Sequence, residues 1–239
     1  MLTIIIPTKN EEVFLPILLE SIKRQSIQPE EIIIADALSD DSTRNIAESF
    51  GAKITNGGLP GPGRNKGAQV AKTKYLLFLD ADVVLSDTDF LRESLNEIIE
   101  SKLDKATCDV LPITESRIDK IVHKFYNMYV RALGRFHAHA PGFCIFVRKD
   151  LHDSIGGFDE TVTFCEDHDY ALRAVRRGKF GFLSKPVPVS IRRFDRDGRH
   201  NIAIKYILAE LHIMFFGPIR HSMFNYTFGH KNSNKNKYI

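Results

Sequence analysis

The stretch Tyr-Leu-Leu-Phe-Leu-Asp-Ala-Asp, residues 75–82, places a run of apolar side chains directly before two carboxylates. This is the composition of a buried strand that ends at a polar edge. In an extended backbone residues i and i+2 face the same side, so Asp80 and Asp82 can reach one cation together. Hard oxygen ligands in this number suit Mg²⁺ or Mn²⁺ bound jointly with phosphate oxygens. A turn or helix-capping role for the aspartates is the plainer alternative.

Similar apolar runs precede this stretch and alternate with helical patterns. The predicted strands are Leu2–Ile6, Glu31–Asp36 and Ala52–Thr55, and the predicted helices between them are Leu15–Ile22 and Ser42–Phe50. Pro16 suits the first turn of the first helix, and a Ser-Thr pair gives a capping signal for the second. The alternation predicts an α/β fold with a Rossmann-like, mostly parallel central sheet and helices on both faces.

The rest of the chain adds less regular segments around this sheet. The predicted elements are a Gly/Pro loop at Gly57–Gly67 running into a short helix near Lys66–Lys72, helices at Phe90–Ile99, Arg117–Arg135 and Asp167–Arg177, strands at Phe143–Arg148, Phe180–Leu183 and Pro188–Ile191, and a mobile loop at Asp195–His200. No linker is long enough to split the chain. We therefore expect one domain over residues 1–200, followed at 201–239 by an amphipathic helix and a basic tail.

Composition narrows the class of protein. The 239 residues carry a net charge of +3, which is too small to indicate a nucleic-acid partner. Three widely spaced cysteines exclude a disulfide framework and favour a reducing, cytoplasmic compartment. The first residues have no basic segment ahead of a long apolar run, so a first strand is expected rather than a signal peptide. We also expect no transmembrane span.

Several motifs, in this order, resemble the family 2 glycosyltransferases of the GT-A fold. They are Ile-Ile-Ile-Pro-Thr-Lys-Asn-Glu-Glu (4–12), Glu-Ile-Ile-Ile-Ala-Asp (31–36), Gly-Arg-Asn-Lys-Gly (63–67), Leu-Asp-Ala-Asp (79–82), Gly-Gly-Phe-Asp-Glu (156–160), Glu-Asp-His-Asp (166–169) and Ser-Ile-Arg-Arg-Phe (190–194). Each motif is weak alone, whereas their order and spacing are specific. The resemblance covers Thr3 to about Arg199 and implies a metal-dependent, inverting transfer of a sugar from a nucleotide diphosphate-sugar.

The resemblance also implies donor-binding residues. Asp36 would accept a hydrogen bond from the nucleotide base, and Pro7 and Glu11 would line the same pocket. Asp80 and Asp82 would contact the ribose and the metal, Mg²⁺ or Mn²⁺, respectively. One departure from the family pattern is Ala37-Leu38, where Asp or Gly followed by Gly is usual. At this position the departure affects how the nucleotide base and the ribose would fit in the donor pocket.

Arg64 lies among glycines near a predicted helix start. A guanidinium and free N–H groups both favour phosphate, so the diphosphate is its expected partner. A plain flexible connection is the alternative, and the segment lacks the Gly-Lys-Ser/Thr ending of a triphosphate-hydrolysing loop.

Two further groups complete the expected site. Glu166 and Asp167 open a predicted helix, and adjacent helical residues do not share a face, so one carboxylate can enter a cleft while the other caps or pairs. By resemblance Asp167 is the general base, and Glu166 is placed with the donor contacts; a capping cluster is the alternative. Arg192 or Arg193, after a late strand, would stabilise charge on the leaving diphosphate. His200 is a candidate third metal ligand.

Two other functions fit parts of the pattern. A sugar-1-phosphate nucleotidyltransferase needs a Gly-rich loop directly after the first strand, where this chain has Pro-Thr-Lys-Asn-Glu-Glu. A catalytically inactive nucleotide-sugar binding module would not need the retained carboxylates, although Ala37-Leu38 keeps this alternative open. A turnover assay separates an active transferase from such a binding module.

Two predicted helical segments in the second half of the chain are both apolar and basic. Arg117–Arg135 and Ile202–Phe216 combine apolar positions with lysine and arginine, and the tail after Glu210 has no acidic residue. This pattern predicts helices lying on the cytoplasmic face of an anionic membrane, with a sugar, polyprenyl-phosphate or other lipid-linked acceptor. Packing of both helices on the sheet or in a dimer is the alternative.

Overall fold

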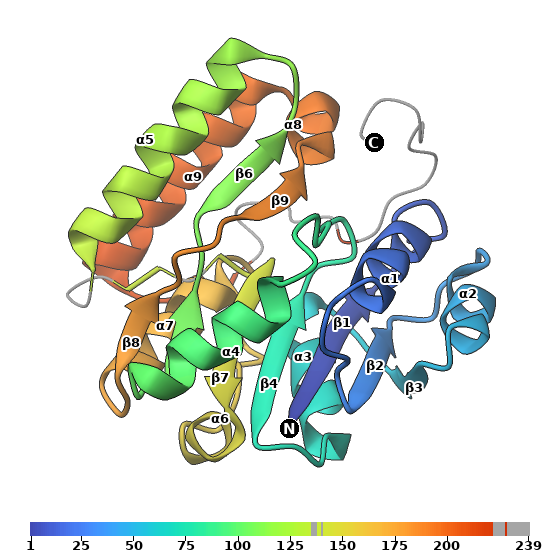
Figure 1. Ribbon diagram of the computed structural model, residues 1–239. Coiled ribbons are helices and arrows are strands. Elements are labelled where there is room, and N and C mark those ends of the chain that lie inside the picture. Colours follow the sequence, from blue (N-terminus) through green and yellow to red (C-terminus); the bar gives the residue numbers. More distant parts are fainter. Residues whose placement is uncertain (135–137, 140, 222–227, 229–239) are drawn as a thin grey trace.

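A seven-stranded sheet forms the centre of the computed structural model, which describes residues 1–134, 138–139, 141–221 and 228 (Figure 1). The strand order is β3-β2-β1-β4-β7-β5-β8. The strands are β1 (Leu2–Thr8), β2 (Glu31–Asp36), β3 (Lys53–Asn56), β4 (Tyr75–Leu79), β5 (Lys105–Thr107), β7 (Cys144–Arg148) and β8 (Phe180–Phe182). β7 runs antiparallel to both of its neighbours and the other pairs are parallel, so the predicted mostly parallel sheet is confirmed.

A second sheet and the helices surround this centre. β6 (Val110–Ile113) and β9 (Val187–Ser190) pair in parallel beside the main sheet (Figure 1). The helices are α1 (Leu15–Lys23), α2 (Thr43–Ser49), α3 (Pro60–Val70), α4 (Phe90–Glu100), α5 (Arg117–Leu133), α6 (Lys149–Ser154), α7 (Glu166–Val175), α8 (Arg192–Asp197) and α9 (Arg199–Phe216).

Apolar side chains cover both faces of the main sheet. On one face Leu15 and Leu18 of α1 and Leu91 of α4 pack with side chains of β1 and β4. On the other face Ala68 of α3 and Tyr170 of α7 join a separate cluster with the remaining strand side chains. β1 and β4 are buried along their whole length, because strands covered on both faces need apolar residues at every position. Helices on both faces were predicted and are confirmed.

The predicted loop at Gly57–Gly67 is wrong for most of its length. α3 begins at Pro60, and its helical turns carry residues that the composition assigned to a loop. Proline is accepted in the first turn of a helix, and glycine is required here by close packing. A Cβ atom on Gly67 would lie 2.3 Å from Cγ2 of Ile5, so only glycine lets α3 approach β1 this closely.

The predicted mobile loop at Asp195–His200 is also wrong. These residues complete α8 and begin α9, with Gly198 between the two helices. Arg192 and Arg193 therefore start a helix and are not strand residues that face opposite sides.

α9 is not an isolated appendage. Arg199 pairs with Asp119, and Tyr129 donates a hydrogen bond to Glu210, so α5 and α9 lie side by side and run in the same direction (Figure 1). The expected boundary at residue 200 therefore falls just inside α9. Within the described part of the chain, no helix combines the length and the hydropathy needed to cross a bilayer. The basic tail predicted after α9 falls mostly outside the described residues, which end at 221 apart from residue 228.

Candidate active site

The carboxyl ends of β1, β2 and β4 meet at one edge of the sheet. Thr8 pairs in register with Asp36, and Asp80 follows the last residue of β4. Parallel strands direct their carboxyl ends to the same edge, where ligands bind in open α/β sheets. The sheet therefore gathers the polar residues predicted from three separate motifs.

Arg64 of α3 is the central cation of this edge. Its guanidinium donates to Oδ1 of Asp80 at 2.7 Å and to Oε1 of Glu166 at 2.8 Å. It also donates to the carbonyl oxygen of Gly142 at 3.0 Å, and its side chain is only 2% exposed. Arg64 thus joins the end of β4 to the start of α7. The predicted diphosphate contact is not tested, and the contacts made here are with carboxylates.

Arg192 forms a second buried ion-pair cluster. It binds both oxygens of Glu11, at 2.7 and 2.8 Å, and its Nε lies 2.9 Å from Oδ2 of Asp82. The guanidinium also lies over the ring of Phe14. Burial raises the pKa of Glu11 to about 7, while the ion pair with Arg192 acts in the opposite direction. Arg192 therefore anchors α8 to the sheet edge through the two predicted donor-site carboxylates.

Asp167 and Glu166 open α7 beside this edge. Cys165, the preceding residue, has φ of 57°, a left-handed conformation that side chains other than glycine rarely adopt. Such strain is concentrated at functional sites, and here it sets the direction in which α7 starts. Oδ2 of Asp167 accepts from the Gly142 amide at 2.6 Å. Burial raises the pKa of Asp167, against the opposing effects of Arg64 and that amide.

Glu166 and Asp167 have different partners, as expected for neighbours on a helix. Glu166 pairs with Arg64, whereas Asp167 is held by backbone amides. Burial, and then the adjacent Asp167, raise the pKa of Glu166. Two neighbouring carboxyl groups with raised pKa values are typical of proton-transfer sites.

Asp36 lies deeper than its predicted role requires. It is fully buried, and its carboxylate accepts hydrogen bonds from Thr8, Ser39 and Arg44. Burial alone would raise the pKa of Asp36, but the hydrogen bonds, chiefly from Ser39, hold it below the ordinary value. The predicted contact with a nucleotide base stays a prediction, and it would require Asp36 to exchange one of these partners.

Leu38 explains the family preference for glycine at its position. Its φ is 57°, and its side chain is 74% exposed. Glycine adopts this conformation without strain, whereas a residue with a Cβ atom is destabilised in it. Lys9 donates a hydrogen bond to the Leu38 carbonyl oxygen and so helps to hold the turn.

The carboxylate pair after β4 can accept a divalent cation. Arg64 uses one oxygen of Asp80 and Arg192 one oxygen of Asp82, which leaves the second oxygen of each for a metal among the contacts of the described residues. Asp80 keeps 39% of its side chain exposed and Asp82 13%. An accessible oxygen pair with nearby cations to limit the negative charge fits Mg²⁺ or Mn²⁺ shared with phosphate.

His200 is exposed in the first turn of α9. Within the described residues it does not form a compact ligand group with the two aspartates, so its role as a ligand stays a prediction. Arg193 of α8 donates to the hydroxyl of Tyr206 of α9, and its contact with the diphosphate stays a prediction.

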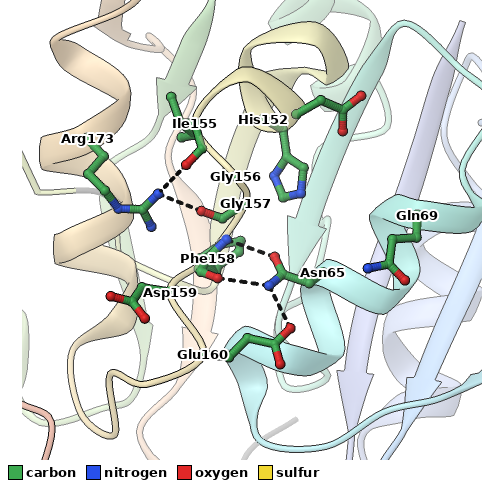
Figure 2. A pocket seen from close by; sticks show the side chains of 11 residues that line it. Asn65, Gln69, His152, Ile155, Gly156, Gly157, Phe158, Asp159, Glu160 and Arg173 are labelled. Atoms are coloured by element: carbon green, nitrogen blue, oxygen red, sulfur yellow. Dashed lines mark hydrogen bonds between the residues drawn. The ribbon is translucent and has the colours of Figure 1, made fainter.

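A cavity of about 650 Å³ lies beside the turn between α6 and α7 (Figure 2). Asn65 exchanges hydrogen bonds with the Phe158 backbone, and Arg173 donates to the carbonyl oxygens of Ile155 and Gly157. Phe158 is buried and stacks on Tyr170. These contacts fix the turn that carries the Gly-Gly-Phe-Asp-Glu motif.

Sequence reasoning missed Gly142. A Cβ atom there would lie 2.6 Å from a terminal nitrogen of Arg64 and 3.2 Å from Oδ2 of Asp167. Its backbone contacts both residues, so glycine is needed where Arg64 and Asp167 approach each other. The Pro-Gly pair at 141–142 signals a turn but does not reveal these partners.

An α/β sheet with a carboxylate pair and an acidic helix start at its carboxyl edge is the architecture of the GT-A glycosyltransferases. The sequence model of glycosyl transferase family 2 matches residues 3–156. The chain belongs to this family.

Curated relatives and solved structures agree with this assignment. The chain is 28% identical over 198 residues to the uncharacterized glycosyltransferase EpsJ of Bacillus subtilis (strain 168). The aligned region covers 75% of this chain and 57% of EpsJ. The chain is 26% identical over 208 residues to the O-antigen chain rhamnosyltransferase WbaN of Salmonella anatum, covering 74% and 61% respectively. This chain therefore spans about three fifths of the length of these two relatives.

Two solved structures share the fold. Staphylococcus aureus TarS 1-349 in complex with UDP-GlcNAc superposes with a TM-score of 0.66 at 19% identity, covering 91% of this chain and 67% of that one. The mannosyltransferase PcManGT from Pyrobaculum calidifontis, in complex with GDP-Man and Mn²⁺, gives 0.66 at 20% identity, covering 87% and 61%.

Proposed function

We propose that this chain transfers a sugar from a nucleotide diphosphate-sugar to an acceptor hydroxyl and inverts the anomeric configuration. The observation that carries the proposal is the meeting of Asp80, Arg64 and Asp167 at the carboxyl edge of the sheet. Support comes from family membership and from related folds crystallised with UDP-GlcNAc or with GDP-Man and Mn²⁺. Asp80-Ala81-Asp82 is the proposed DXD motif. Asp80 and Asp82 would hold Mg²⁺ or Mn²⁺, which when bound neutralises diphosphate charge.

Asp167 is the proposed general base. Its carboxylate would take the proton of the acceptor hydroxyl while the acceptor oxygen bonds to the anomeric carbon. The bond from that carbon to the diphosphate oxygen breaks, and the nucleotide diphosphate leaves with the bonding electrons. The raised pKa of Asp167 supports this role, because a base with a higher pKa accepts a proton more readily.

The arginines would act on the leaving group from fixed positions. Arg64 lies between Asp80 and Glu166, so a diphosphate that approached Asp80 would come within reach of its guanidinium. Arg192 is proposed to hold Glu11 and Asp82 in place, and Arg193 to contact the diphosphate. Preorganised cations stabilise the charge that develops as the bond breaks.

We further propose that the two-helix unit formed by α5 and α9 rests on an anionic membrane and brings a lipid-linked acceptor to the site. Its exposed large apolar side chains are Ile118, Ile121, Val122, Phe125, Met128 and Tyr129 of α5, and Ile204, Tyr206, Ile207, Leu208, Leu211, Met214, Phe215 and Phe216 of α9. An exposed surface of this size marks a partner or membrane site.

Charge identifies the proposed partner of this surface. The two acidic residues of α5 and α9, Asp119 and Glu210, are both engaged, with Arg199 and with Tyr129 and His139 respectively. Arg117, Lys120 and Lys124 of α5 are exposed. Apolar side chains flanked by exposed cations fit the interface of an anionic leaflet.

A donor and metal screen tests the proposed transfer. Nucleotide diphosphate-sugars should raise the melting temperature more with Mn²⁺ than without it, and EDTA should abolish transfer. Asp82→Asn should remain folded and lose most activity, whereas Asp150→Asn, a change of an exposed carboxylate in α6, should keep it. Full activity in EDTA would reject the metal role. Donor binding without turnover by the wild-type chain on every acceptor class would favour the binding-module alternative.

A further inference from the structure

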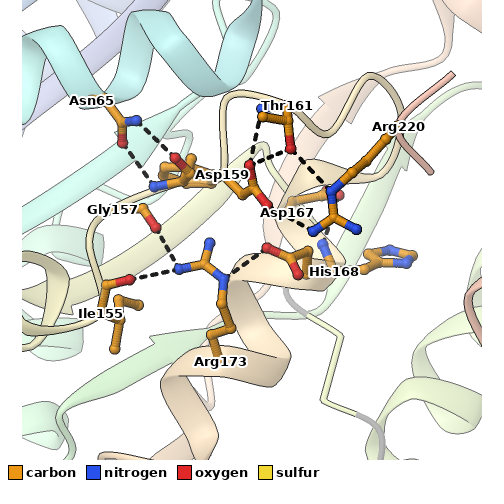
Figure 3. Close-up of polar contacts among 11 residues, drawn as sticks. Asn65, Ile155, Gly157, Asp159, Thr161, Asp167, His168, Arg173 and Arg220 are labelled. Atoms are coloured by element: carbon orange, nitrogen blue, oxygen red, sulfur yellow. Dashed lines mark hydrogen bonds and ion pairs between the residues drawn. The ribbon is translucent and has the colours of Figure 1, made fainter. Parts of the chain in front are cut away.

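Three metal-binding side chains meet away from the carboxylate pair after β4. His139 follows α5, His168 lies in α7, and Glu210 lies in α9. Their ligand atoms all lie within 4.8 Å of one another. Nε2 of His139 is 3.0 Å from Oε1 of Glu210, and Nδ1 of His168 is 3.7 Å from Oε2. Figure 3 shows His168 next to Asp167 at the start of α7.

We propose that His139, His168 and Glu210 bind one Zn²⁺ ion. This site is distinct from the proposed Mg²⁺ or Mn²⁺ site at Asp80 and Asp82. Zinc holds imidazole and carboxylate ligands at about 2.0–2.2 Å, which places tetrahedral donors roughly 3.3–3.5 Å apart. The separations are 3.0 Å from Nε2 of His139 to Oε1 of Glu210 and 3.7 Å from Nδ1 of His168 to Oε2. They lie on either side of this range, and each histidine faces a different oxygen of the carboxylate. Two nitrogen donors favour zinc over the hard cations of an all-oxygen pair. Water would complete the fourth position.

The surroundings suit an ordered metal site. His139 is 2% exposed and His168 is 9% exposed, and their rings lie 4.1 Å apart between centroids. Two imidazolium ions this close would repel each other, whereas two neutral imidazoles can share one cation. Tyr129 donates to Glu210 at 3.2 Å and so orients the carboxylate, as outer partners of metal ligands commonly do.

The site would fasten the two-helix unit to the catalytic helix. Its ligands come from the segment after α5, from α7 and from α9. His168 directly follows Asp167, and its backbone amide donates to Oδ1 of Asp167. A metal bound here would therefore hold α9 next to Asp167, the proposed base.

Metal content and cobalt spectroscopy test the proposal independently of transfer. The parent protein is the full chain with Asp82→Asn, which weakens the oxygen site. After incubation with Zn²⁺ and dialysis, this parent should retain one equivalent of zinc, and Co²⁺ should give the intense visible absorption of four-coordinate cobalt. His139→Gln and Glu210→Gln should each lose both signals. His212→Gln, a histidine change in the same helix, should keep them.

Two results would overturn the proposal. One is an Asp82→Asn parent that retains no zinc and shows only weak, octahedral cobalt bands, which would make the cluster a hydrogen-bonded network. The other is unchanged zinc content in His139→Gln and Glu210→Gln variants that circular dichroism shows to be folded. If a variant fails to fold, the parent spectrum alone decides.

Discussion

Asp167 lies 2.6 Å from the Gly142 amide at the start of α7, and burial raises its pKa above the ordinary value of 3.8. Because the base acts only when ionised, kcat/KM should fall as pH drops through this raised pKa. The acid limb should therefore lie at a higher pH than an ordinary aspartate would give. Asp167→Asn should bind donor normally and transfer at least ~100-fold more slowly, which steady-state kinetics with a donor-binding titration can measure.

The same shift has a consequence for stability. A carboxyl whose pKa is raised on folding contributes stability below its unfolded pKa, and this contribution is lost as pH rises through the folded value. Asp167→Asn should therefore unfold at no lower urea concentration than the wild type at pH 7.

The kinetics of Asp167→Asn have two contrary outcomes. Unchanged turnover would point to an acceptor that is already anionic, such as a lipid phosphate. Weakened donor binding with normal turnover would remove Asp167 from the base role.

Leu38 gives a prediction about backbone strain. Its left-handed φ of 57° destabilises any residue that carries a Cβ atom. Leu38→Gly should raise the free energy of unfolding by about 1 kcal/mol, after allowing for the greater flexibility of glycine in the unfolded chain. Leu38→Ala, which removes the exposed side chain but keeps Cβ, should show no comparable gain. Equal stability of the glycine and alanine variants in urea denaturation would contradict the strain.

The packing of α3 on β1 depends on Gly67. A Cβ atom there would lie 2.3 Å from Cγ2 of Ile5. Overpacking destabilises by about 1–3 kcal/mol, and the helix-propensity gain of Ala over Gly, about 1 kcal/mol, offsets only part of this. Gly67→Ala should therefore lower the free energy of unfolding by up to about 2 kcal/mol. Lys66→Ala, an exposed change in the same helix, should stay within about 0.5 kcal/mol. A more stable Gly67→Ala variant would show that α3 can move away from β1 at little cost.

At the scale of the whole molecule, the exposed apolar side chains of α5 and α9 form the proposed membrane surface. The full chain should co-sediment with anionic vesicles at low salt, and binding should weaken with salt and on neutral vesicles. The double variant Phe125→Asp and Phe215→Asp should bind at least ~10-fold more weakly, since each phenylalanine loses apolar burial in the bilayer. The matched control is Val70→Asp with Ile99→Asp, two exposed apolar residues on other helices.

Other outcomes of this experiment identify other partners. No binding of the intact chain to anionic vesicles at low salt would reject the membrane proposal. A stable dimer in light scattering, lost in the Phe125→Asp and Phe215→Asp variant, would instead assign the surface to a second copy of the chain.

Local patterns in the sequence were enough to predict the main strands and the position of the carboxylates. Apolar runs determine which segments are buried, and parallel strands bring their carboxyl ends to one edge, so Asp36, Asp80 and Asp82 were correctly placed near that edge. The resemblance to glycosyltransferases rested on the order of short motifs, each of which is local. The match of the family model to residues 3–156 confirms the family.

Only the tertiary structure decided which side chains meet. Arg64 and Glu166 are 102 residues apart, Glu11 and Arg192 are 181 apart, and His139 and Glu210 are 71 apart. Composition also assigned Gly57–Gly67 to a loop, although α3 begins at Pro60. Propensity is local, whereas Gly67 is required by the contact of α3 with β1. Periodicity predicts the face on which a side chain lies, but its partner depends on how distant elements pack.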